Sequence, residues 1–334
     1  MKYEILKALR EAAPEFVSGE ALSRLLGVTR TSVWKCINEL RTENYEIEAS
    51  SRNGYRFVSK PVRLNSFEIA YRLGTVTIGR NVLYYDELDS TNSYAKKLAT
   101  EGCEDGTVVI AGRQTAGRGR IGRNWYSPQD KGIYMTVVLK PMIPPEKIQL
   151  LTLAASVAAV DAIRCVCDVE AGIKWPNDII LDGKKVCGIL TEMNCETDLV
   201  NFAAIGIGIN FSQKPGDFPD ELRDKAVSLM TYLQDRGTQG KTPDRLDLIR
   251  SVLTELDKGY SLLMEDCGSE IVEMWKQRSL TIGREVSIHH RDGQFTGIAR
   301  NITLDGRLVV SCSDGAIREV LSGEISVRGL LGYI

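Results

Sequence analysis

A segment of eleven residues, 113–123, combines four arginines with three glycines and contains no acidic residue. It follows an apolar run typical of a buried strand, residues 107–111, and precedes Asn124-Trp125-Tyr126. Glycine lets backbone N–H groups approach a ligand closely, and arginine adds forked donors. Because the whole chain has a formal net charge of only -2, this local excess of positive charge predicts a loop that binds a specific anion, such as a phosphate group.

The length of the chain, 334 residues, exceeds the size at which a single core usually divides, so two or three domains are expected. Apolar residues make up 43% and charged residues 26%, which is ordinary for a soluble globular protein. The chain starts with a mixed-charge helix, not with a secretion signal. The most apolar stretch, residues 148–160, is too short to span a bilayer and predicts a buried core helix. We therefore expect a cytoplasmic protein.

The arrangement of the cysteines and histidines predicts neither a zinc site nor catalysis by these residues. The eight cysteines are scattered, and the close pair Cys165 and Cys167 has no second pair at zinc spacing. Reduced structural cysteines are expected, and no protein-held metal site is predicted. The two histidines, His289 and His290, are adjacent and would point to opposite faces of a strand. Catalysis by a histidine is therefore not expected.

Residues 1–60 predict a winged helix-turn-helix domain. Two helices, the second beginning at Ser18, precede a turn at Gly27 and a third helix capped by Thr29. Alternation around Asn53-Gly54 predicts a hairpin with a two-residue turn, the wing. The expected core residues are apolar and helically spaced: Ile5, Leu6, Leu9, Leu22, Leu25, Leu26, Val33, Trp34, Ile37 and Leu40.

The polar face of the third helix predicts DNA binding, since this helix enters the major groove in the winged-helix arrangement. The expected DNA-binding residues are Arg30, Thr31, Ser32, Lys35, Asn38, Arg52 and Arg56. Residues 1–60 hold ten basic and eight acidic residues, a net charge of +2, so a single copy should bind DNA weakly. The alternative is a helical protein-interaction domain whose polar face is merely solvated.

A larger domain is expected from Pro61 to residue 278, with strands and helices in an α/β or α+β layer arrangement. The expected helices lie near residues 91–101, 147–166 and 244–265. The expected strands are residues 82–85, 107–111, 133–139, 178–181, 186–193 and 202–209. From residue 279 to 334, turns at Asp292-Gly293, Asp305-Gly306 and Asp314-Gly315 predict a small β-barrel or sandwich.

Two glycine-rich motifs imitate nucleotide-binding signatures without their context. Residues 117–122 fit G-x-G-x-x-G, but Pro128 and no helical period follow, so a dinucleotide-binding fold is not predicted. Residues 237–242 imitate a P-loop, but Asp235 replaces the first glycine and no strand precedes it. A surface loop is expected there.

Four further segments carry polar groups suited to a site beside the arginine-rich loop. Residues 174–178 and 183–188 flank a short strand, and the lysine behind the Gly183 turn can project its ammonium group into a cleft. Residues 206–210 form a strand whose glycines permit close approach. Residues 89–92 form a helix cap. Taken singly, each segment also has a purely structural interpretation.

Together, these segments resemble the biotin protein ligases, specifically the bifunctional type that carries an N-terminal DNA-binding domain and represses the biotin operon. The resemblance covers essentially the whole chain. Its motifs are residues 114–125, 174–178, 185–190, Asn210, Phe218-Pro219 and 323–326. Val227 stands where the family pattern has threonine, which puts only a local contact in doubt.

The resemblance implies a multidomain α+β protein. Its central domain would be a mixed-sheet ligase domain of the class II aminoacyl-tRNA synthetase-like, lipoate–biotin ligase fold, followed by a C-terminal SH3-like β-barrel. Biotin and ATP, the latter with Mg²⁺, would form biotinyl-5′-AMP, which transfers biotin to a lysine of the biotin carboxyl carrier protein. Biotinyl-AMP would also promote a homodimer that binds operator DNA.

The resemblance also assigns residues. The catalytic candidates are Lys185, Arg118 and Arg120, because placed cations offset the repulsion between a carboxylate and a polyphosphate. The biotin-binding candidates are Ser90, Thr91, Asn92, Gln114, Gly117, Arg118, Gly119, Arg120, Lys185 and Gly188. The candidates for ATP or adenylate binding are Arg118, Arg120, Arg123, Trp125, Asn177, Asp178, Lys185 and Asn210. Asp178 is the weak candidate for the base that deprotonates the acceptor lysine.

Two other functions stay open. A lipoate–protein ligase would share the fold and the reaction, although the Gly-Arg-Gly-Arg loop matches biotin ligases better. A ligand-sensing transcription factor without ligase activity is the other, although Arg118, Arg120 and Lys185 are all retained.

Overall fold

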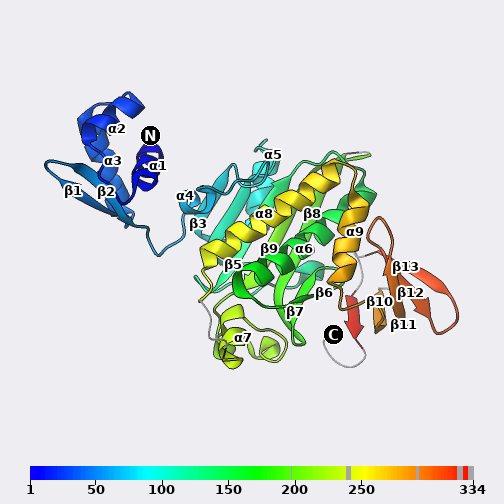
Figure 1. Cartoon of the computed structure of the whole chain (residues 1–334). Helices are drawn as coiled ribbons and strands as arrows, with labels where there is room; N and C mark the ends of the chain where they lie inside the picture. Colours follow the sequence, from blue (N-terminus) through cyan, green and yellow to red (C-terminus); the bar gives the residue numbers. More distant parts are fainter. Residues whose placement is uncertain (197, 238–241, 291–292, 322–325, 330–334) are drawn as a thin grey trace. The chain divides into compact units, whose positions relative to one another are not determined.

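The computed structural model describes residues 1–196, 198–237, 242–290, 293–321 and 326–329. The chain forms two compact units, Met1–Phe67 (the N-terminal unit) and Glu68–Ile334 (the main unit). Figure 1 labels the helices and strands of both. The domain boundaries given above at Pro61 and residue 279 stay predictions.

The N-terminal unit has the predicted order of three helices and a hairpin. Its elements are α1 (Lys2–Ala12), α2 (Gly19–Leu26), α3 (Arg30–Thr42), β1 (Glu46–Ser50) and β2 (Gly54–Ser59). Ser18 caps α2 by accepting the N–H of Ala21, and Thr29 caps α3 by accepting the N–H of Ser32. Gly27 ends α2 with φ of 64°, a left-handed conformation that glycine adopts without strain. The helix-turn-helix and the hairpin are thus confirmed.

Two residues predicted for the core of this unit lie on its surface. Leu25 is 67% exposed and Trp34 is 54% exposed. The buried side of α3 is formed by Val33, Cys36, Ile37 and Leu40, so Cys36 takes an inward position, and Trp34 falls outside this buried stripe. The prediction included every apolar residue near the helical spacing, whereas the orientation of each helix is set by the apolar positions that lie on one stripe.

The turn of the wing also differs from the prediction. Ser50 pairs with Gly54, so the loop contains three residues, 51–53, and Gly54 already belongs to β2. Gly54 has φ of 99°, and a Cβ there would lie 2.2 Å from the carbonyl oxygen of Val17. The close approach of the chain before α2 therefore requires a glycine at position 54. The loop is one residue longer than the predicted two-residue turn.

A seven-stranded mixed sheet forms the centre of the main unit, in the order β3-β4-β5-β9-β8-β7-β6. Only β3 and β4 pair in parallel; the other neighbours are antiparallel. The strands are β3 (Val82–Leu88), β4 (Val108–Gln114), β5 (Gly132–Leu139), β6 (Gly172–Lys174), β7 (Asp178–Leu181), β8 (Lys184–Glu196) and β9 (Leu199–Asn210). Six were predicted; β6 was missed because three residues carry no recognisable alternation.

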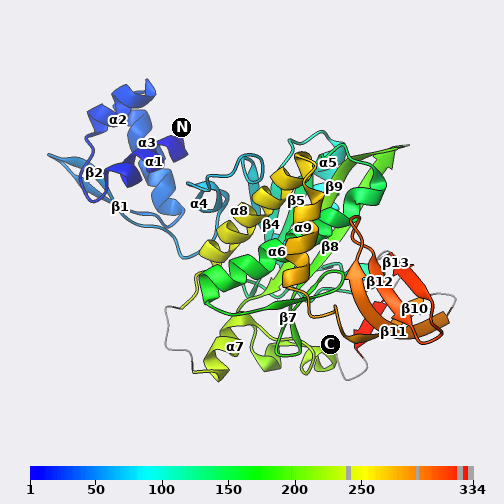
Figure 2. The same ribbon diagram turned by 45° about the vertical axis from the view of Figure 1, so that its right-hand side comes forward.

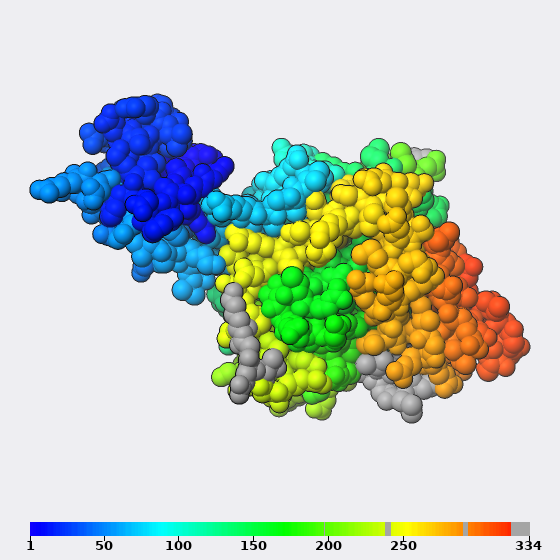
Figure 3. Space-filling view, viewed as in Figure 1, coloured from blue at the N-terminus to red at the C-terminus, as the bar shows by residue number. Residues whose placement is uncertain are grey.

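Helices cover both faces of this sheet. The helices of the main unit are α5 (Thr91–Thr100), α6 (Ile148–Cys167), α7 (Leu229–Asp235), α8 (Arg245–Met264) and α9 (Gly268–Gln277), of which α5 and α6 contact the sheet directly. The short helix α4 (Ser66–Ala70) contains the boundary between the two units. Figures 1 and 2 show α6 on one face with α8 and α9 beside it. In the space-filling view, α8 (yellow) and α9 (orange) form much of that surface, with green atoms visible between them (Figure 3). The segment Pro145–Cys167 is apolar and long enough to cross a membrane, but 78% of its apolar window is buried, as predicted for a core helix.

The C-terminal part of the main unit is a small antiparallel β-domain. Its strands are β10 (Glu285–His290), β11 (Gly293–Ile302), β12 (Leu308–Cys312), β13 (Ile317–Val320) and β14 (Ser326–Gly329), in the order β13-β12-β11-β10-β14. Gly306 and Gly315 have positive φ, as their predicted turns require. Asp292, residues 323–325 and most of the P-loop-like segment (residues 238–241) lie outside the described residues.

Trp175 joins this β-domain to the mixed sheet. Its backbone N–H donates to Thr281 Oγ1 at 2.8 Å, and its indole N–H donates to the carbonyl oxygen of Gly306 at 3.2 Å. The side chain is 1% exposed. Trp175 precedes Pro176 and Asn177, so the β-domain is attached directly next to one of the predicted site segments.

Asp257 of α8 is expected to be important for the stability of the main unit. Its buried carboxylate accepts N–H groups from Val76, Thr77 and Ile78 at 2.7, 2.9 and 2.7 Å. Because Asp257→Ala leaves these donors without their acceptor, it should lower the free energy of unfolding by about 3 kcal/mol, measured by urea denaturation. The matched control on the same helix is Asp247→Ala, which removes an exposed carboxylate and should change stability by less than about 0.5 kcal/mol. Equal losses in both variants would contradict this role.

Candidate active site and DNA-binding surface

One cavity of about 800 Å³ brings together the sequence segments singled out above. Arg118 and Lys185, which come from separate segments, both line it. Of the biotin and adenylate candidates, the lining residues are Ser90, Thr91, Asn92, Gln114, Arg118, Gly119, Arg120, Arg123, Trp125, Asn177, Asp178, Lys185, Gly188 and Asn210. The volume is typical of a pocket for a small organic ligand.

Glycines on two neighbouring strands form the floor of the cavity. Gly188 of β8 pairs with Gly208 of β9, and Gly206 lies on the same face two residues earlier. A Cβ on Gly206 would lie 2.1 Å from Asn92 Oδ1, and one on Gly208 would lie 2.5 Å from the ring of Trp125. The missing side chains therefore let Asn92 and Trp125 lie directly on the sheet.

Hydrogen-bonded polar side chains form one wall. The backbone N–H and the hydroxyl of Thr91 both donate to Gln114 Oε1, at 2.8 and 3.0 Å, and Gln114 Nε2 donates to Ser127 Oγ at 2.9 Å. Ser90 caps α5 by accepting the N–H of Ser93. These links fix the amide of Gln114 and thereby the donors and acceptors that a polar ligand would meet.

The arginine loop is folded as a hairpin between β4 and β5. The N–H of Trp125 donates to the carbonyl oxygen of Gly117 at 2.9 Å, and the N–H of Gly119 donates to that of Arg123 at 2.7 Å. A Cβ on Gly117 would lie 2.4 Å from the carbonyl oxygen of Trp125, so Gly117 closes the base of this hairpin, and it is not among the lining residues. At the tip, Ile121 has φ of 55°, which strains a β-branched residue and is typical of functional loops.

Lys185 and Arg120, two of the catalytic candidates, both contact side chains of the neighbouring residues Asn177 and Asp178. Lys185 Nζ lies 2.5 Å from Asp178 Oδ1 and 5.4 Å from the centre of the Trp125 ring. Arg120 donates to Asn177 Oδ1 at 3.0 Å. Burial lowers the pKa of the Arg120 guanidinium, although the charge of Asp178 acts in the opposite direction. An anion that reached this group would therefore meet a partly desolvated cation.

Arg118 pairs with an acidic residue, Glu192, that was not among the predicted site residues. Glu192 of β8 lies 3.3 Å from Arg118, binds Lys96 at 2.7 Å, and accepts a hydrogen bond from Asn92 at 3.0 Å. Burial alone would raise the pKa of Glu192, but these donors and charges outweigh it and lower the pKa. The available signal was the period-two spacing of Gly188, Leu190 and Glu192 on one face of β8.

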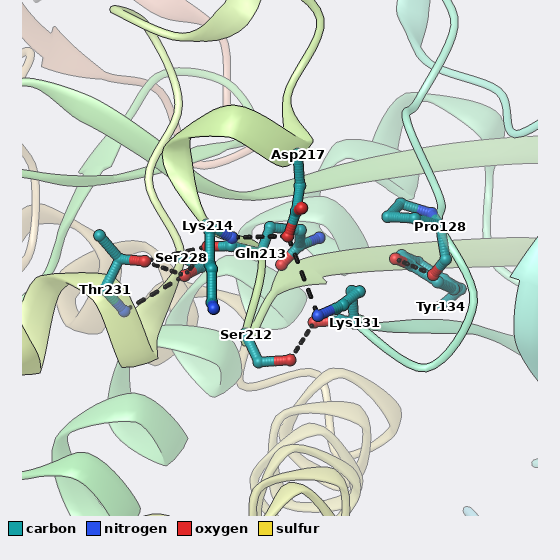
Figure 4. Close-up of polar contacts among 9 residues, drawn as sticks. All are labelled: Pro128, Lys131, Tyr134, Ser212, Gln213, Lys214, Asp217, Ser228 and Thr231. Carbon is teal, nitrogen blue, oxygen red and sulfur yellow. Dashed lines mark hydrogen bonds and ion pairs between the residues drawn. The ribbon is translucent and has the colours of Figure 1, made fainter.

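The segment between β9 and α7 forms another wall and was largely missed. Its lining residues are Phe218, Glu221, Leu222, Asp224, Lys225 and Ala226. Ser228 Oγ and Thr231 Oγ1 both donate to the carbonyl oxygen of Gln213, at 2.6 and 3.0 Å, which draws the two ends of the segment together (Figure 4). Asp217 accepts the N–H of Lys214 and lies 3.9 Å from Lys131 Nζ, as the same view shows.

Two backbone hydrogen bonds attach this segment to Lys185. The N–H of Lys185 donates to the carbonyl oxygen of Lys225 at 2.8 Å, and the N–H of Val227 donates to that of Lys185 at 3.0 Å. Val227, where the family pattern has threonine, thus keeps a contact that does not depend on its side chain.

Three residues near the site occupy surface or core positions that point to a structural role. Arg113 pairs with Glu87 at 3.1 Å on the surface, and Lys184 is exposed. Cys187 is fully buried, and burial raises the pKa of its thiol, which favours packing over chemistry. The part of the chain that the structure describes contains no group of three or more His, Cys, Asp or Glu that could hold a metal ion.

The predicted DNA-binding residues lie on α3 and the wing. Arg30, Thr31 and Lys35 are exposed, and neither Arg30 nor Lys35 forms an ion pair within the described ranges. Two others have partners within the unit: Ser32 Oγ lies 2.9 Å from Thr29 Oγ1, and Asn38 accepts from Arg41 at 3.4 Å.

The two arginines of the wing differ. Arg52 is exposed at the tip, whereas Arg56 pairs with Glu48 and lies 4.6 Å from the ring centre of Phe16. Arg52 is therefore the freer of the two to reach a ligand.

Three family models match the chain in succession. An "HTH domain" matches residues 2–56, the "Biotin/lipoate A/B protein ligase family" matches residues 84–210, and the "Biotin protein ligase C terminal domain" matches residues 281–328. The bifunctional ligase/repressor BirA of Bacillus subtilis (strain 168) is 40% identical over 98% of both chains. The chain belongs to the bifunctional biotin ligase/repressor family.

A second BirA and a solved biotin protein ligase extend the comparison. BirA of Escherichia coli (strain K12) is 29% identical over 94% of both chains. The structure of the biotin protein ligase from Aquifex aeolicus, in complex with biotin and ATP, is 29% identical with a TM-score of 0.63, and the match covers 75% of this chain and 99% of that one. The predicted arrangement of DNA-binding, mixed-sheet ligase and C-terminal β-domains is thereby confirmed.

Glu192 is expected to hold the arginine loop closed through Arg118. Because such a partly exposed ion pair contributes about 0.5–1 kcal/mol, Glu192→Gln should speed trypsin cleavage after the loop arginines about two- to fivefold. The matched control is Glu196→Gln on the same strand, since Glu196 is exposed and has no ion pair in the described structure. Peptide mapping over a digestion time course measures both rates, and equal cleavage of the Glu192→Gln variant and the wild-type protein would refute this function of Glu192.

Proposed function

We propose that the cavity forms biotinyl-5′-AMP from biotin and ATP, and that the N-terminal unit binds operator DNA in response. Membership in the ligase/repressor family gives the reaction class, ligation of biotin to a carrier protein. The observation that carries the residue assignment is the opening of Arg118 and Lys185 onto the same cavity. We also propose that the chain works in the cytoplasm.

The first half-reaction brings two anions together. The biotin carboxylate attacks the α-phosphate of ATP, a P–O bond to that carboxylate forms, and pyrophosphate leaves. Lys185, Arg118 and Arg120 would offset the repulsion and stabilise the charge of the transition state. Support comes from the contact of Lys185 with both Asp178 and the Trp125 ring, since an ammonium group held there can reach a ligand over the sheet.

The two substrates would occupy different parts of the cavity. The polar wall at Ser90, Thr91 and Gln114 suits the ureido ring of biotin, and the glycine floor suits its apolar tail. The purine and phosphates would lie toward Trp125, Asn177 and Arg123, with Asn210 at the end of β9. What supports this order is the spread of polar groups from the α5 cap to the β6–β7 turn.

The second half-reaction needs a base for the acceptor lysine. Asp178 is our candidate, because its carboxylate lies at the cavity and next to the cation that would bind the phosphate. Attack by the lysine amine forms the amide bond, AMP leaves, and the carboxylate accepts the proton. Closure of the arginine hairpin would keep water from the mixed anhydride before this step.

Mg²⁺ fits this site as an ion bound mainly by the ATP phosphates. Asp178, Asn177 and Asn210 place oxygen atoms along the cavity, and oxygen ligands suit Mg²⁺. When bound, the ion would neutralise phosphate charge.

Repression would follow from ligand-dependent dimerisation. The N-terminal unit has few unpaired basic side chains on α3 and the wing, so one copy offers little phosphate binding. A homodimer presents two copies to paired half-sites, and the second then binds at a high effective concentration.

Lys185→Ala should reduce biotin transfer to an isolated carrier domain about 10²–10³-fold, the typical effect of removing one transition-state donor. The matched control is Lys184→Ala, since Lys184 is exposed and one residue away on β8, and its transfer rate should equal that of wild type. Mass spectrometry of the carrier domain measures the added acid. Supplying lipoate in place of biotin separates the two ligase types, and an undiminished rate in the Lys185→Ala protein would refute the assignment.

DNA retention should require both substrates. With biotin and ATP together, the full chain should shift operator DNA at protein concentrations at which biotin alone or ATP alone gives little binding, because only the adenylate favours the dimer. Gel-shift titrations measure binding, and light scattering on the same samples measures the dimer. Equal binding in all three conditions would remove the regulatory part of the proposal and leave the ligase intact.

A further inference from the structure

The N-terminal unit leaves one large aromatic side chain outside its core. Trp34 is 54% exposed, although it lies near the middle of α3, and the core of this unit is already closed by Val33, Cys36, Ile37 and Leu40. The position of Trp34 is therefore not explained by the folding of this unit, because exposing an indole forgoes the free energy of its burial.

The surroundings of Trp34 are polar and basic. Arg30, Thr31 and Asn38 lie three or four residues away and therefore share its side of the helix. The segment from Arg30 to Asn38 contains no acidic residue, and the exposed cations Arg30 and Lys35 have no ion-pair partner among the described residues. An apolar ring framed by unpaired cations is complementary to an anionic surface that carries an apolar group.

The major groove of DNA is such a surface. Phosphates line its edges, and the C5 methyl group of thymine is the apolar group that base edges present there. We propose that Trp34 is a specificity-determining residue that packs against a thymine methyl group in the operator. This inference rests on the proposed DNA binding of the N-terminal unit and adds a base preference to it.

The test uses a methyl deletion on the DNA side. The full wild-type chain, with biotin and ATP, first selects duplexes from a random-sequence pool, and the selected duplex is then synthesised with uracil in place of each recurrent thymine. Wild type should lose about fourfold in affinity for each covered methyl, the value expected for a buried group of that size. The Trp34→Ala protein should bind the thymine and uracil duplexes equally.

Leu25→Ala is the matched control, because it removes an exposed apolar side chain from the neighbouring helix α2. This variant should keep the wild-type difference between thymine and uracil. Trp34→Ala should also keep the wild-type thermal unfolding midpoint, and Trp34→Gln provides a second variant with a polar side chain.

The outcomes are distinct. If Trp34→Ala and Trp34→Gln lose the same factor as wild type on the uracil duplex, the contact with thymine is wrong. If both variants unfold at a markedly lower temperature, Trp34 is a core residue and the inference fails on structural grounds. If the wild-type protein selects no sequence at all, the proposed sequence-specific DNA binding of the N-terminal unit is wrong. The inference about Trp34 is then wrong as well.

Discussion

Two carboxylates, Asp178 and Glu192, each hold a cation of the site, Lys185 and Arg118 respectively. Cations collected around one cavity repel one another, and the chain offsets this repulsion with its own acids. The acids lie on β7 and β8, so the rigid sheet sets the positions of the cations, including one on the arginine loop. A phosphate that entered the cavity would replace a carboxylate as the partner of a cation. The cation is already positioned for an anion, so it would need to move little.

The same sheet sets the shape of the cavity through residues that lack side chains. Gly188, Gly206 and Gly208 let Trp125 and Asn92 approach the backbone closely. Asn92 also donates to Glu192, so the glycine floor and the charge network share a residue. Shape and electrostatics are therefore coupled, and a side chain added to the floor would disturb both.

The sequence predicted the elements that have strong local signals. Helices with clear caps at Ser18 and Thr29 and long apolar strands were found, and the segments of the site were identified together. Glu192 was missed because its partner Arg118 is distant in sequence, and no local pattern encodes that pairing. Trp34 and Leu25 were misplaced because aromatic and aliphatic character predicts burial on average, whereas the face of a helix that is buried depends on its neighbours.

The link through Trp175 has a consequence for dividing the protein. Both its backbone N–H and its indole N–H are bonded to the C-terminal β-domain, although Trp175 belongs to the chain segment that forms the cavity wall. Removing residues 279–334 would expose an aromatic ring and leave two donors without acceptors beside the cavity. Protein engineers who need a minimal ligase would therefore do better to shorten this chain from its N-terminus, where the compact unit Met1–Phe67 has a core of its own.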